Sequence, residues 1–432
     1  MDKNILRLAI PNIISNITVP LLGMIDMFIV GHLSSELFIG AIAIAVMIFN
    51  LMYWSFSFLR MGTSGFTAQA YGAKNHKEVV NILLRSLSVA FIGSALILIF
   101  QYFILQVALF FIQGSPEVMN LASEYFQIYV WAAPAVLGMY AFTGWFVGLQ
   151  DAKTPMYVAI SVNIINIVCS LFFVFVLTWE LNGVALGSAI AQISGFLICL
   201  LVALSKYKNL RQYVGWGFIE KLSDLSAFFK VNSNIFLRTL CIIIVSTFFT
   251  SASAKFGDTT LAVNSLMMQL FILFSYMMDG FAYAAEALTG RFVGERNTES
   301  LRLLVKRLFV WGIRLTMGFT ILYLVFSKGI LGLLTDKESV LQMADDYIGW
   351  VLLIPIAGFS AFLWDGIFIG MTASKQMRDT MFIAMLSFFA IYYGTKGFLA
   401  NDGLWFAFIF YLAMRGVVQA LIFRKIKHRV GL

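Results

Sequence analysis

The stretch LAIPNIISNITVPLLGMIDMFIV, residues 8–30, decides the fold class of this chain. Apart from Asp26 it carries no charged side chain, and about 20 apolar residues let a helix cross the hydrocarbon core of a bilayer. Its apolar residues are continuous, whereas the strands of an outer-membrane barrel alternate between apolar and polar residues in segments of about ten. The stretch therefore predicts a transmembrane helix and argues against a barrel strand.

Eleven further apolar stretches lie at residues 37–59, 86–112, 126–148, 155–177, 183–204, 232–254, 261–287, 308–330, 349–371, 380–398 and 404–423. Over the 432 residues, 60% are hydrophobic and 12% are charged, whereas soluble chains have about 45–50% apolar and about 25% charged residues. This composition leaves too little polar side chain to cover a soluble globule of this size. We predict an all-α polytopic membrane protein with twelve transmembrane helices.

The Lys and Arg residues are distributed unevenly between the two sides of the predicted membrane. Of the 30, 22 fall in the termini and loops of one side, four fall on the other side and four lie in or near the spans. Because cytoplasmic loops carry the excess of Lys and Arg, both termini are expected in the cytoplasm, in a bacterial-type cytoplasmic membrane. The net charge of +8 is then a signal of topology, so we expect the lipid bilayer as a partner but no nucleic acid.

The two halves of the chain match at one constant offset in sequence. The matches are Tyr71–Asn75 with Val293–Asn297, Phe146–Gly148 and Lys153 with Phe368–Gly370 and Lys375, and Ala122 and Tyr125 with Ala344 and Tyr347. We call two positions related by this offset equivalent positions. Several matches at one offset indicate a duplicated unit of six spans, and an even number of spans gives both copies the same orientation. We expect an amino-terminal lobe over residues 1–204, a cytoplasmic linker over 205–230 and a carboxy-terminal lobe over 231–432, around a central cavity.

Asp26 is the strongest functional candidate, because it has apolar residues on both sides within a predicted span. A charge near the bilayer centre costs about 2.5–3.5 kcal/mol on insertion scales. Burial favours the neutral form of a carboxyl group, which suits a residue that binds and releases a proton. The same span holds Pro11 and Pro20, and the helix is expected to bend there because proline lacks a backbone N–H. The alternative is a structural carboxyl group that is hydrogen-bonded to a neighbouring helix.

Neutral polar residues occur with helical spacing in the fifth and sixth spans. Asn166 and Ser170 are four residues apart, as are Ser188 and Gln192, so each pair shares one face of its helix. Gathered around a carboxylate, their oxygen atoms can hold a proton network or Na+, the one metal ion that we consider for this site. Hydrogen bonding between helices is the other common use of such residues.

Further charged residues lie in or near the predicted spans. Among them are Arg60 in the first half, and Arg238, Asp279, Glu286, Asp365 and Arg415 in the second. Asp365 lies well inside the tenth span, so it either lines a cavity as part of a second polar network or forms a structural salt bridge. The sequence alone leaves these two interpretations open.

Motifs of catalysis and cofactor binding are absent from the sequence. There is no P-loop, no HExxH or GxSxG motif and no cluster of metal-ligating residues, so we expect neither an enzyme nor a cofactor. The three cysteines, Cys169, Cys199 and Cys241, lie in apolar stretches without metal-ligand spacing. The loops are too short for a nucleotide-binding domain, so transport would draw its energy from an ion gradient.

Four separated motifs resemble the multidrug and toxic compound extrusion (MATE) family, and in particular its DinF-like branch. They are Pro11 with Gly23–Leu33, Phe58–Ala70, Asp279–Ala287 and Trp364–Gly370. The resemblance implies a two-lobe antiporter of twelve helices that exports amphipathic, often cationic, small molecules in exchange for H+ or Na+. It also implies an ion site on Asp26, with Asn166 on the fifth helix and Ser188 on the sixth.

This chain departs from the family pattern at one position. Members with a full ion site carry a second Asp one turn after the Asn, where this chain has Ser170. With one carboxylate in place of two, the comparison favours H+ over Na+ as the coupling ion. We expect a multidrug exporter that works as a monomer by alternating access of its two lobes, with Asp26 as the ion-coupling carboxylate.

A flippase of a lipid-linked oligosaccharide is the alternative function, because such proteins share the topology. A flippase cavity needs several basic residues to bind a pyrophosphate group. Here only Arg60, Arg238 and Arg415 are available, and carboxylates are at least equally common in the spans. The sequence therefore favours an ion-coupled exporter.

Overall fold

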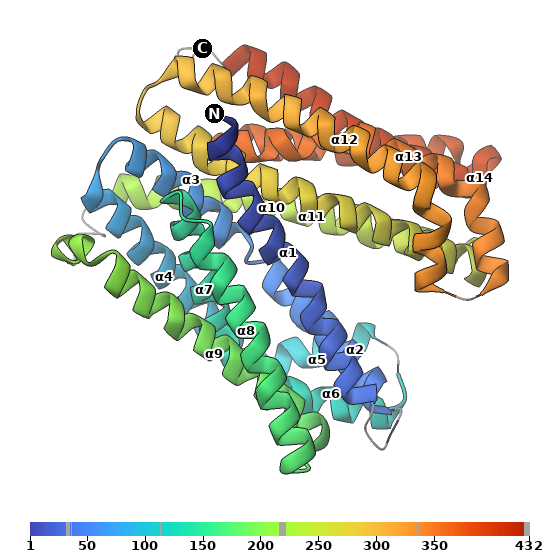
Figure 1. The fold of residues 1–432 in the computed structure, drawn as a ribbon. Helices are drawn as coiled ribbons and strands as arrows, with labels where there is room; N and C mark the ends of the chain where they lie inside the picture. The colour runs from blue at the N-terminus through green and yellow to red at the C-terminus, as the bar shows by residue number, and fades with distance from the viewer. Residues whose placement is uncertain (32–34, 36, 113, 216–221, 336, 427–432) are drawn as a thin grey trace. The chain divides into compact units, whose positions relative to one another are not determined.

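The computed structural model describes residues 1–31, 35, 37–112, 114–215, 222–335 and 337–426. Within these residues the chain is helical and contains no strand (Figure 1). The helices are α1 (Asp2–Gly31), α2 (Leu37–Trp54), α3 (Phe58–Gly72), α4 (His76–Ile99), α5 (Gln101–Phe111), α6 (Pro116–Tyr129), α7 (Ala133–Gly148), α8 (Lys153–Leu171), α9 (Glu180–Lys206), α10 (Leu222–Ala254), α11 (Asp258–Gly294), α12 (Thr298–Leu334), α13 (Glu338–Gly370) and α14 (Ser374–Ile426). Short helical segments are η1 (Val130–Ala132), η2 (Phe172–Val176) and η3 (Lys208–Tyr213).

The helices are long and apolar enough to cross a membrane. Eleven such stretches lie within the described part of the chain, and the last of them, in α14, is two helices merged across a kink at Ala400. Ala400 has a φ of 47°, and its equivalent Thr178, in the turn between α8 and α9, has a φ of 58°. The kink is therefore the turn between the fifth and sixth helices of the second repeat. Counted on either side of this turn, the spans number twelve, as predicted.

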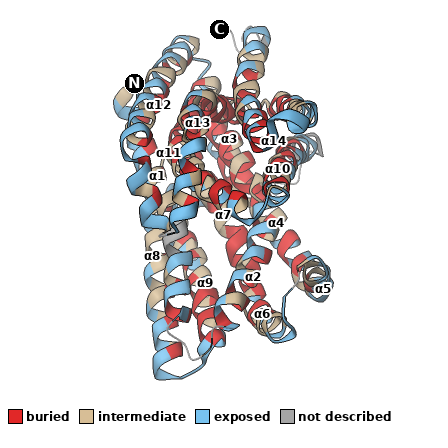
Figure 2. Cartoon of the chain, turned by 90° about the vertical axis from the view of Figure 1, so that its right-hand side faces the viewer, coloured by how far each residue is buried: buried red, intermediate tan, exposed pale blue. Residues whose placement is uncertain are grey.

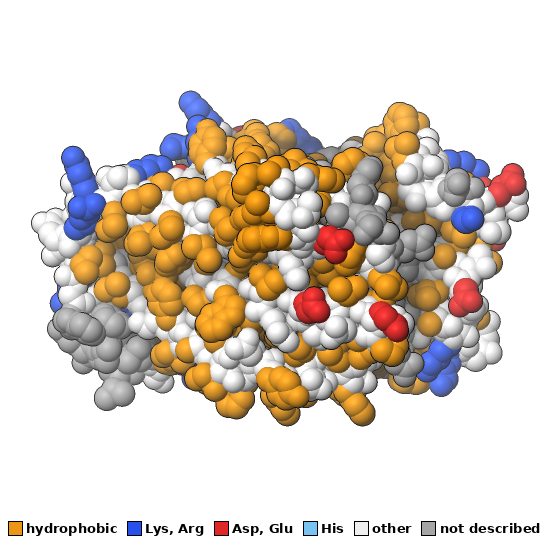
Figure 3. Space-filling view, turned by 90° about the horizontal axis from the view of Figure 1, so that it is seen from below, with side chains coloured by type: hydrophobic (Ala, Val, Ile, Leu, Met, Phe, Trp, Pro, Cys, Tyr) orange, Lys and Arg blue, Asp and Glu red, His pale blue; other side chains and the backbone are white. Residues whose placement is uncertain are grey.

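Large apolar side chains are exposed on the surface, as expected for helices that face lipid. Phe110, Phe111 and Leu333 are 82%, 78% and 88% exposed. Hydrophobic side chains cover large areas of the face that Figure 3 shows. Buried residues gather instead on a few helices, among them α7 and α13 (Figure 2). These two helices are the fourth span of the first repeat and the fourth span of the second.

The backbone confirms the repeat that the sequence predicts. Lys74 ends the turn after α3 with a φ of 55°, and Arg296 ends the turn after α11 with a φ of 54°. The next residues, Asn75 and Asn297, both cap the following helix, because each side chain accepts a hydrogen bond from a backbone N–H three residues on. Both pairs occupy equivalent positions, so the same local structure occurs at the same point of both repeats.

Glycines bring corresponding helices into backbone contact in both repeats. A Cβ atom on Gly144 of α7 would overlap the carbonyl oxygen of Arg60 in α3. A Cβ atom on Gly366 of α13 would overlap the carbonyl oxygen of Ala282 in α11 in the same way. Small residues at helix contacts let backbones approach closely in membranes. The two glycines are equivalent, and so are the two carbonyl groups, so this contact is a property of the repeated unit.

By their internal contacts, the residues form two compact units. One covers Ile14–Phe228, and the other covers Phe229–Leu432 together with Met1–Ile13. The first thirteen residues of the chain therefore group with the second repeat by their contacts. Residues 216–221 of the expected linker lie outside the described residues, while Lys208–Tyr213 forms a short 3-10 helix.

Candidate functional site

Asp26 lies on the buried face of α1. Its side chain is 5% exposed, and Ile29 and Val30, three and four residues further on, are buried as well. Met24 and Phe28 lie on the opposite side of the helix and are 65% and 67% exposed. The helix therefore holds this carboxyl group in the interior of the protein and turns its apolar residues outward.

Two helices distant in sequence bring neutral polar groups to Asp26. The side chains of Asn166 from α8 and Ser188 from α9 both interact with its carboxyl group. Asn166 also donates a hydrogen bond from Nδ2 to Oγ of Ser188, over 2.8 Å. All three side chains are buried. The structure thus brings together three residues that the sequence analysis selects from three separate spans.

Ser170 lies one turn beyond Asn166 on the same buried face of α8. It sits against α9, because a Cβ atom on Gly187 would contact both its backbone and its hydroxyl group. Gly187 directly precedes Ser188, so Ser170 lies close to the polar group around Asp26. We call Asp26, Asn166, Ser170 and Ser188 the Asp26 cluster.

Three buried oxygen atoms of the Asp26 cluster have no hydrogen-bond partner among the described residues. They are Oδ1 of Asp26, Oδ1 of Asn166 and Oγ of Ser170. Carboxylate and amide oxygens accept hydrogen bonds or bind cations, and a hydroxyl oxygen can do the same. Since buried polar atoms are nearly always paired, open acceptors at one place indicate a missing donor or cation. The cluster can therefore take up a proton, or a hard cation that prefers oxygen ligands such as Na+.

Helix α6 contributes two tyrosines that the sequence analysis missed as site residues. Tyr125 neighbours Ser188 and lies close enough to Asp26 for the two groups to interact electrostatically. Tyr129, one turn further on, neighbours Gln192 and so links this predicted residue to the site. Two tyrosines four residues apart on one helix face are the sequence signal that could have found them.

Helix α1 is continuous through both of its prolines. The side chain of Pro20 lies outside the described residues, and Pro11 is buried in the first half of the helix. Asn163 of α8 donates a hydrogen bond from Nδ2 to the backbone carbonyl of Thr18, over 2.8 Å. This bond ties α8 to α1 just before Pro20. The bend of α1 at the two prolines stays a prediction.

A second buried polar group lies in the other repeat, around Asp365 of α13. Arg238 from α10 and Arg415 from α14 both donate to its Oδ2, the latter over 2.8 Å. Gln419 donates to its Oδ1 over 2.6 Å. We call these four residues the Asp365 cluster. Of the two interpretations that the sequence leaves open for Asp365, the structure shows the salt bridge.

The three remaining candidates lie in different places. Asp279 of α11 acts electrostatically on Arg415 and therefore neighbours the Asp365 cluster. Glu286 is buried further along α11, where its backbone carbonyl faces Gly370. Arg60 is buried in α3, at the glycine contact with α7. The structure therefore groups Asp279 with Asp365 and places Glu286 and Arg60 at helix contacts.

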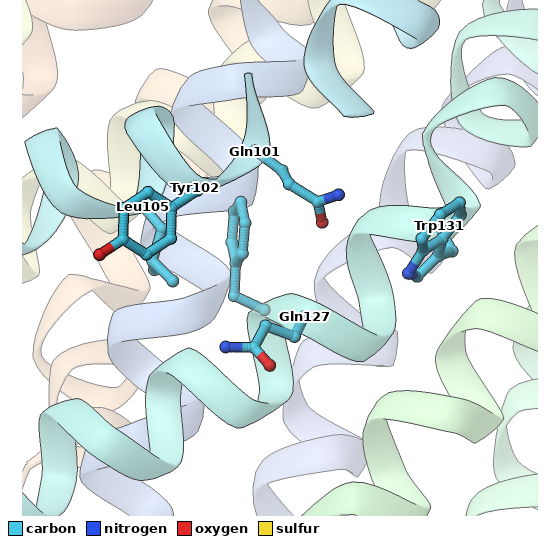
Figure 4. A pocket seen from close by; sticks show the side chains of 6 residues that line it. Gln101, Tyr102, Leu105, Gln127 and Trp131 are labelled. Carbon is cyan, nitrogen blue, oxygen red and sulfur yellow. The ribbon is translucent and has the colours of Figure 1, made fainter. Parts of the chain in front are cut away.

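A pocket of about 380 Å³ lies in the first repeat between α5, α6 and η1. Its lining includes Gln101, Leu105, Gln127 and Trp131, and Figure 4 shows that the two glutamines come from different segments. The lining residues do not include the Asp26 cluster. This pocket is therefore separate from the site that the buried polar residues form.

Comparison with known proteins finds relatives along most of the chain. The family model described as MatE matches residues 11–172 and 235–393. The DNA damage-inducible protein F of Escherichia coli (strain K12) is 35% identical over 436 residues, which cover 98% of this chain and 92% of that protein. The multidrug and toxin extrusion protein 1 of Oryctolagus cuniculus is 26% identical over 310 residues, which cover 69% of this chain and 52% of that protein.

Solved structures share the fold at low sequence identity. A crystal structure of MATE in the bent conformation is 20% identical, with a TM-score of 0.88 over 99% of this chain and 96% of that one. An outward-facing conformation of a multidrug resistance MATE family transporter of the MOP superfamily also has 20% identity and a TM-score of 0.88, over 100% of this chain and 96% of that one. These similarities show the twelve-helix, two-lobe fold that the sequence predicts.

Proposed function

The chain belongs to the MatE family of membrane transporters, and on that premise we propose that it exports amphipathic, often cationic, small molecules in exchange for protons. It is a multi-pass membrane transporter and not an enzyme. The observation that carries the proposal is the Asp26 cluster, in which a buried carboxyl group has neutral partners and open oxygen atoms lie beside it. The multidrug and toxin extrusion of the Oryctolagus cuniculus relative supports the substrate class.

Asp26 acts as the ion-coupling carboxylate in this proposal. Because its partners Asn166 and Ser188 are uncharged, they leave its protonation state free to change during the transport cycle. The ionised carboxylate accepts hydrogen bonds from them, while the protonated carboxyl group can donate one to an open oxygen of Asn166 or Ser170. A proton thus selects between two hydrogen-bond patterns of α1, α8 and α9. Alternating access of the two lobes follows if each pattern favours one conformation.

The proposed coupling ion is H+, with Na+ as the other species that the oxygen atoms could bind. One proton neutralises the single carboxylate completely. Hard cations prefer sites with several oxygen ligands, and carboxylate charge raises their affinity. Position 170 holds a serine, so only Asp26 supplies a carboxylate to the cluster. No other cofactor enters the proposal.

Orientation and oligomeric state are also part of the proposal. The excess of Lys and Arg in the loops on one side of the predicted spans supports cytoplasmic termini in a bacterial inner or plasma membrane. The relative from Escherichia coli, 35% identical, supports a bacterial-type membrane. We propose that the transporter works as a monomer, since each chain carries both repeats and one complete Asp26 cluster.

The flippase alternative is not favoured by the geometry. Arg238 and Arg415 are two of the three buried arginines that the sequence analysis considered for binding a pyrophosphate group. Both donate hydrogen bonds to Asp365, so their charge is already compensated inside the protein. An exporter that uses the uncompensated carboxyl group of Asp26 agrees better with this arrangement.

Dye efflux in everted membrane vesicles tests the proposed coupling. With the pH gradient collapsed and the Na+ gradient kept, efflux of a cationic dye should stop. With the Na+ gradient collapsed and the pH gradient kept, it should continue, because one proton neutralises Asp26 without any further ligand. Vesicles from cells that lack the protein give the background. Efflux that survives the loss of both gradients would rule out ion coupling, and efflux that follows Na+ alone would rule out H+.

Ser170→Asp should make transport more dependent on Na+. The substitution places a second carboxylate beside the Asp26 cluster, and two nearby like charges either keep one proton bound or recruit a cation that neutralises both. We expect a larger Na+-induced rise in thermal stability, and a larger stimulation of dye efflux by Na+, than in the parent. Ser170→Asn is the control of equal size without charge. An identical Na+ response in the Asp and Asn variants would show that position 170 does not act on the site.

A further inference from the structure

The positions equivalent to the Asp26 cluster hold no carboxylate in the second repeat. The positions equivalent to Asp26, Asn166 and Ser170 hold Phe248, Phe388 and Tyr392. The ring of Phe248 meets those of Phe388 and Tyr392 edge-on, with centroids 5.9 Å and 5.1 Å apart. The second repeat therefore keeps this contact between its first and fifth helices but fills it with aromatic rings. Coupling through that repeat would need a carboxylate at a different place.

Asp365 is such a carboxylate, and its surroundings differ from those of Asp26. In the first repeat, the positions equivalent to Arg238, Asp365, Arg415 and Gln419 hold Asn16, Thr143, Ile193 and Leu197, all uncharged. The Asp365 cluster thus belongs to the second repeat only, as the Asp26 cluster belongs to the first. The two repeats have the same backbone fold, but the buried carboxylate of the first has neutral partners and that of the second has positively charged partners.

Both oxygen atoms of Asp365 are engaged. Oδ2 accepts from Arg238 and from Arg415, and Oδ1 accepts from Gln419. The guanidinium group of Arg415 also lies 5.7 Å and 5.5 Å from the ring centroids of Phe362 and Tyr411, close enough for cation–π attraction. All four members of the cluster are buried. The cations that neutralise this carboxylate are therefore parts of the protein itself.

The charges around Asp365 are balanced. The titratable and charged groups that surround it are Arg238 and Cys241 from α10, Asp279 from α11, and Tyr411 and Arg415 from α14. Two guanidinium groups face two carboxylates, while the thiol and the phenol are neutral near pH 7. The two carboxylates are already neutralised by fixed positive charges, so an added cation would meet no uncompensated negative charge. Binding of a proton or Na+ at Asp365 is thereby opposed.

We propose that Arg238 and Arg415 are specificity-determining residues that act as built-in cations at Asp365 and so restrict ion exchange to one carboxylate, Asp26. The inference rests on the proposed function of Asp26. Without the two guanidinium groups, Asp365 would be a buried carboxyl group with only neutral donors, in the same condition as Asp26. The basic residues, and not the absence of a carboxylate, then keep the second repeat from binding a coupling ion.

The double variant Arg238→Gln/Arg415→Gln tests this inference. Glutamine keeps a hydrogen-bond donor toward Asp365 and removes the positive charge. The full-length protein is reconstituted in lipid vesicles, and infrared difference spectroscopy records the carbonyl band of protonated carboxyl groups. The parent should show a band that Asp26→Asn removes. The double variant should show an additional band that disappears in the triple variant Arg238→Gln/Arg415→Gln/Asp365→Asn, and its proton uptake per transported dye should rise about twofold.

The possible outcomes separate this inference from the proposed function. If the parent spectrum has no band that depends on Asp26, the proposed role of Asp26 is wrong. The inference about Asp365 can still be tested in that case, because it compares the double variant with the triple variant. A folded double variant without the additional band overturns the inference. If the double variant is not recovered in folded form, the uncharged triple variant provides the second measurement. A titrating band that the parent shows and the triple variant lacks would mean that Asp365 already binds protons in the parent, and this would overturn the inference. Identical carboxyl bands in the parent and the triple variant would support it.

Discussion

Asp26→Asn is expected to abolish ion-coupled efflux while the protein still folds. Asparagine has nearly the same shape as aspartate and can hydrogen-bond with Asn166 and Ser188, so the packing of α1 against α8 and α9 should survive. It has no titratable group, so the step in which a proton selects between two hydrogen-bond patterns is lost. Everted vesicles should show no dye accumulation above background, and purified protein should melt at or slightly above the parent temperature.

Asp151→Asn is the matched control, the same chemical change at a carboxylate between α7 and α8. Asp151 accepts hydrogen bonds from Lys206 over 2.7 Å and from Tyr207 over 2.9 Å, and Thr154 donates to it as well. Burial alone would raise the pKa of Asp151, but these donors lower it below its usual value. A lowered pKa stabilises the fold above the unfolded pKa, and this stabilisation is lost as the pH falls through the folded pKa. The control should therefore lose thermal stability near pH 7 and keep its coupling.

The opposite result at Asp26 has a clear meaning. If Asp26→Asn vesicles still accumulate dye in response to a pH gradient, Asp26 is a structural residue, and its open oxygen does not take part in coupling. If dye moves down its own gradient but no longer responds to pH, the variant has lost coupling and kept the transport path. That second result agrees with the proposed role, because the substitution removes the proton site without changing the substrate cavity.

The fold could be predicted because a bilayer limits the possible structures so strongly. Any chain segment in the hydrocarbon core must satisfy its backbone hydrogen bonds internally, so continuous apolar stretches have to be helices. The constant offset between matching segments then identifies the repeat. The structure shows the same repeat in local details, because Asn75 and Asn297 cap helices at equivalent positions. Contacts by which residues 1–13 group with the second repeat were not predictable, since they depend on packing between distant segments.

The candidate site was predictable where residues of one helix define a face, where a buried charge is rare, and where the family resemblance names a position. Asn166 and Ser170 share a face by their spacing, and the rarity of a buried carboxylate singles out Asp26. Tyr125 and Tyr129 share a face of another helix by their spacing, but nothing along the chain indicates that this helix, α6, packs beside α9. The partners of Asp365 are 127 and 50 residues away in sequence, which is why a cavity residue and a salt bridge looked equally possible.

Gly366→Ala is expected to be the most disruptive single-methyl change in α13. The added Cβ atom would overlap the backbone carbonyl of Ala282, and a helix backbone cannot move aside as a side chain can. The two helices must separate, and overpacking of this kind costs about 1–3 kcal/mol or more. The fraction of monodisperse protein after mild heating in detergent measures the effect, and we expect Gly366→Ala to lose most of it at a temperature where the parent remains folded.

Gly358→Ala, two turns earlier in the same helix, is the matched control. Its Cβ atom would lie no closer than 3.6 Å to any neighbour, so the methyl group fits. Alanine is a better helix former than glycine by about 1 kcal/mol, so this variant should be as stable as the parent or more stable. Equal stability of the two variants would show that α11 and α13 are not held at backbone contact. The repeat adds a further requirement: Gly144→Ala, at the position equivalent to Gly366, meets the carbonyl of Arg60 in the same way and must destabilise the first repeat to a similar degree.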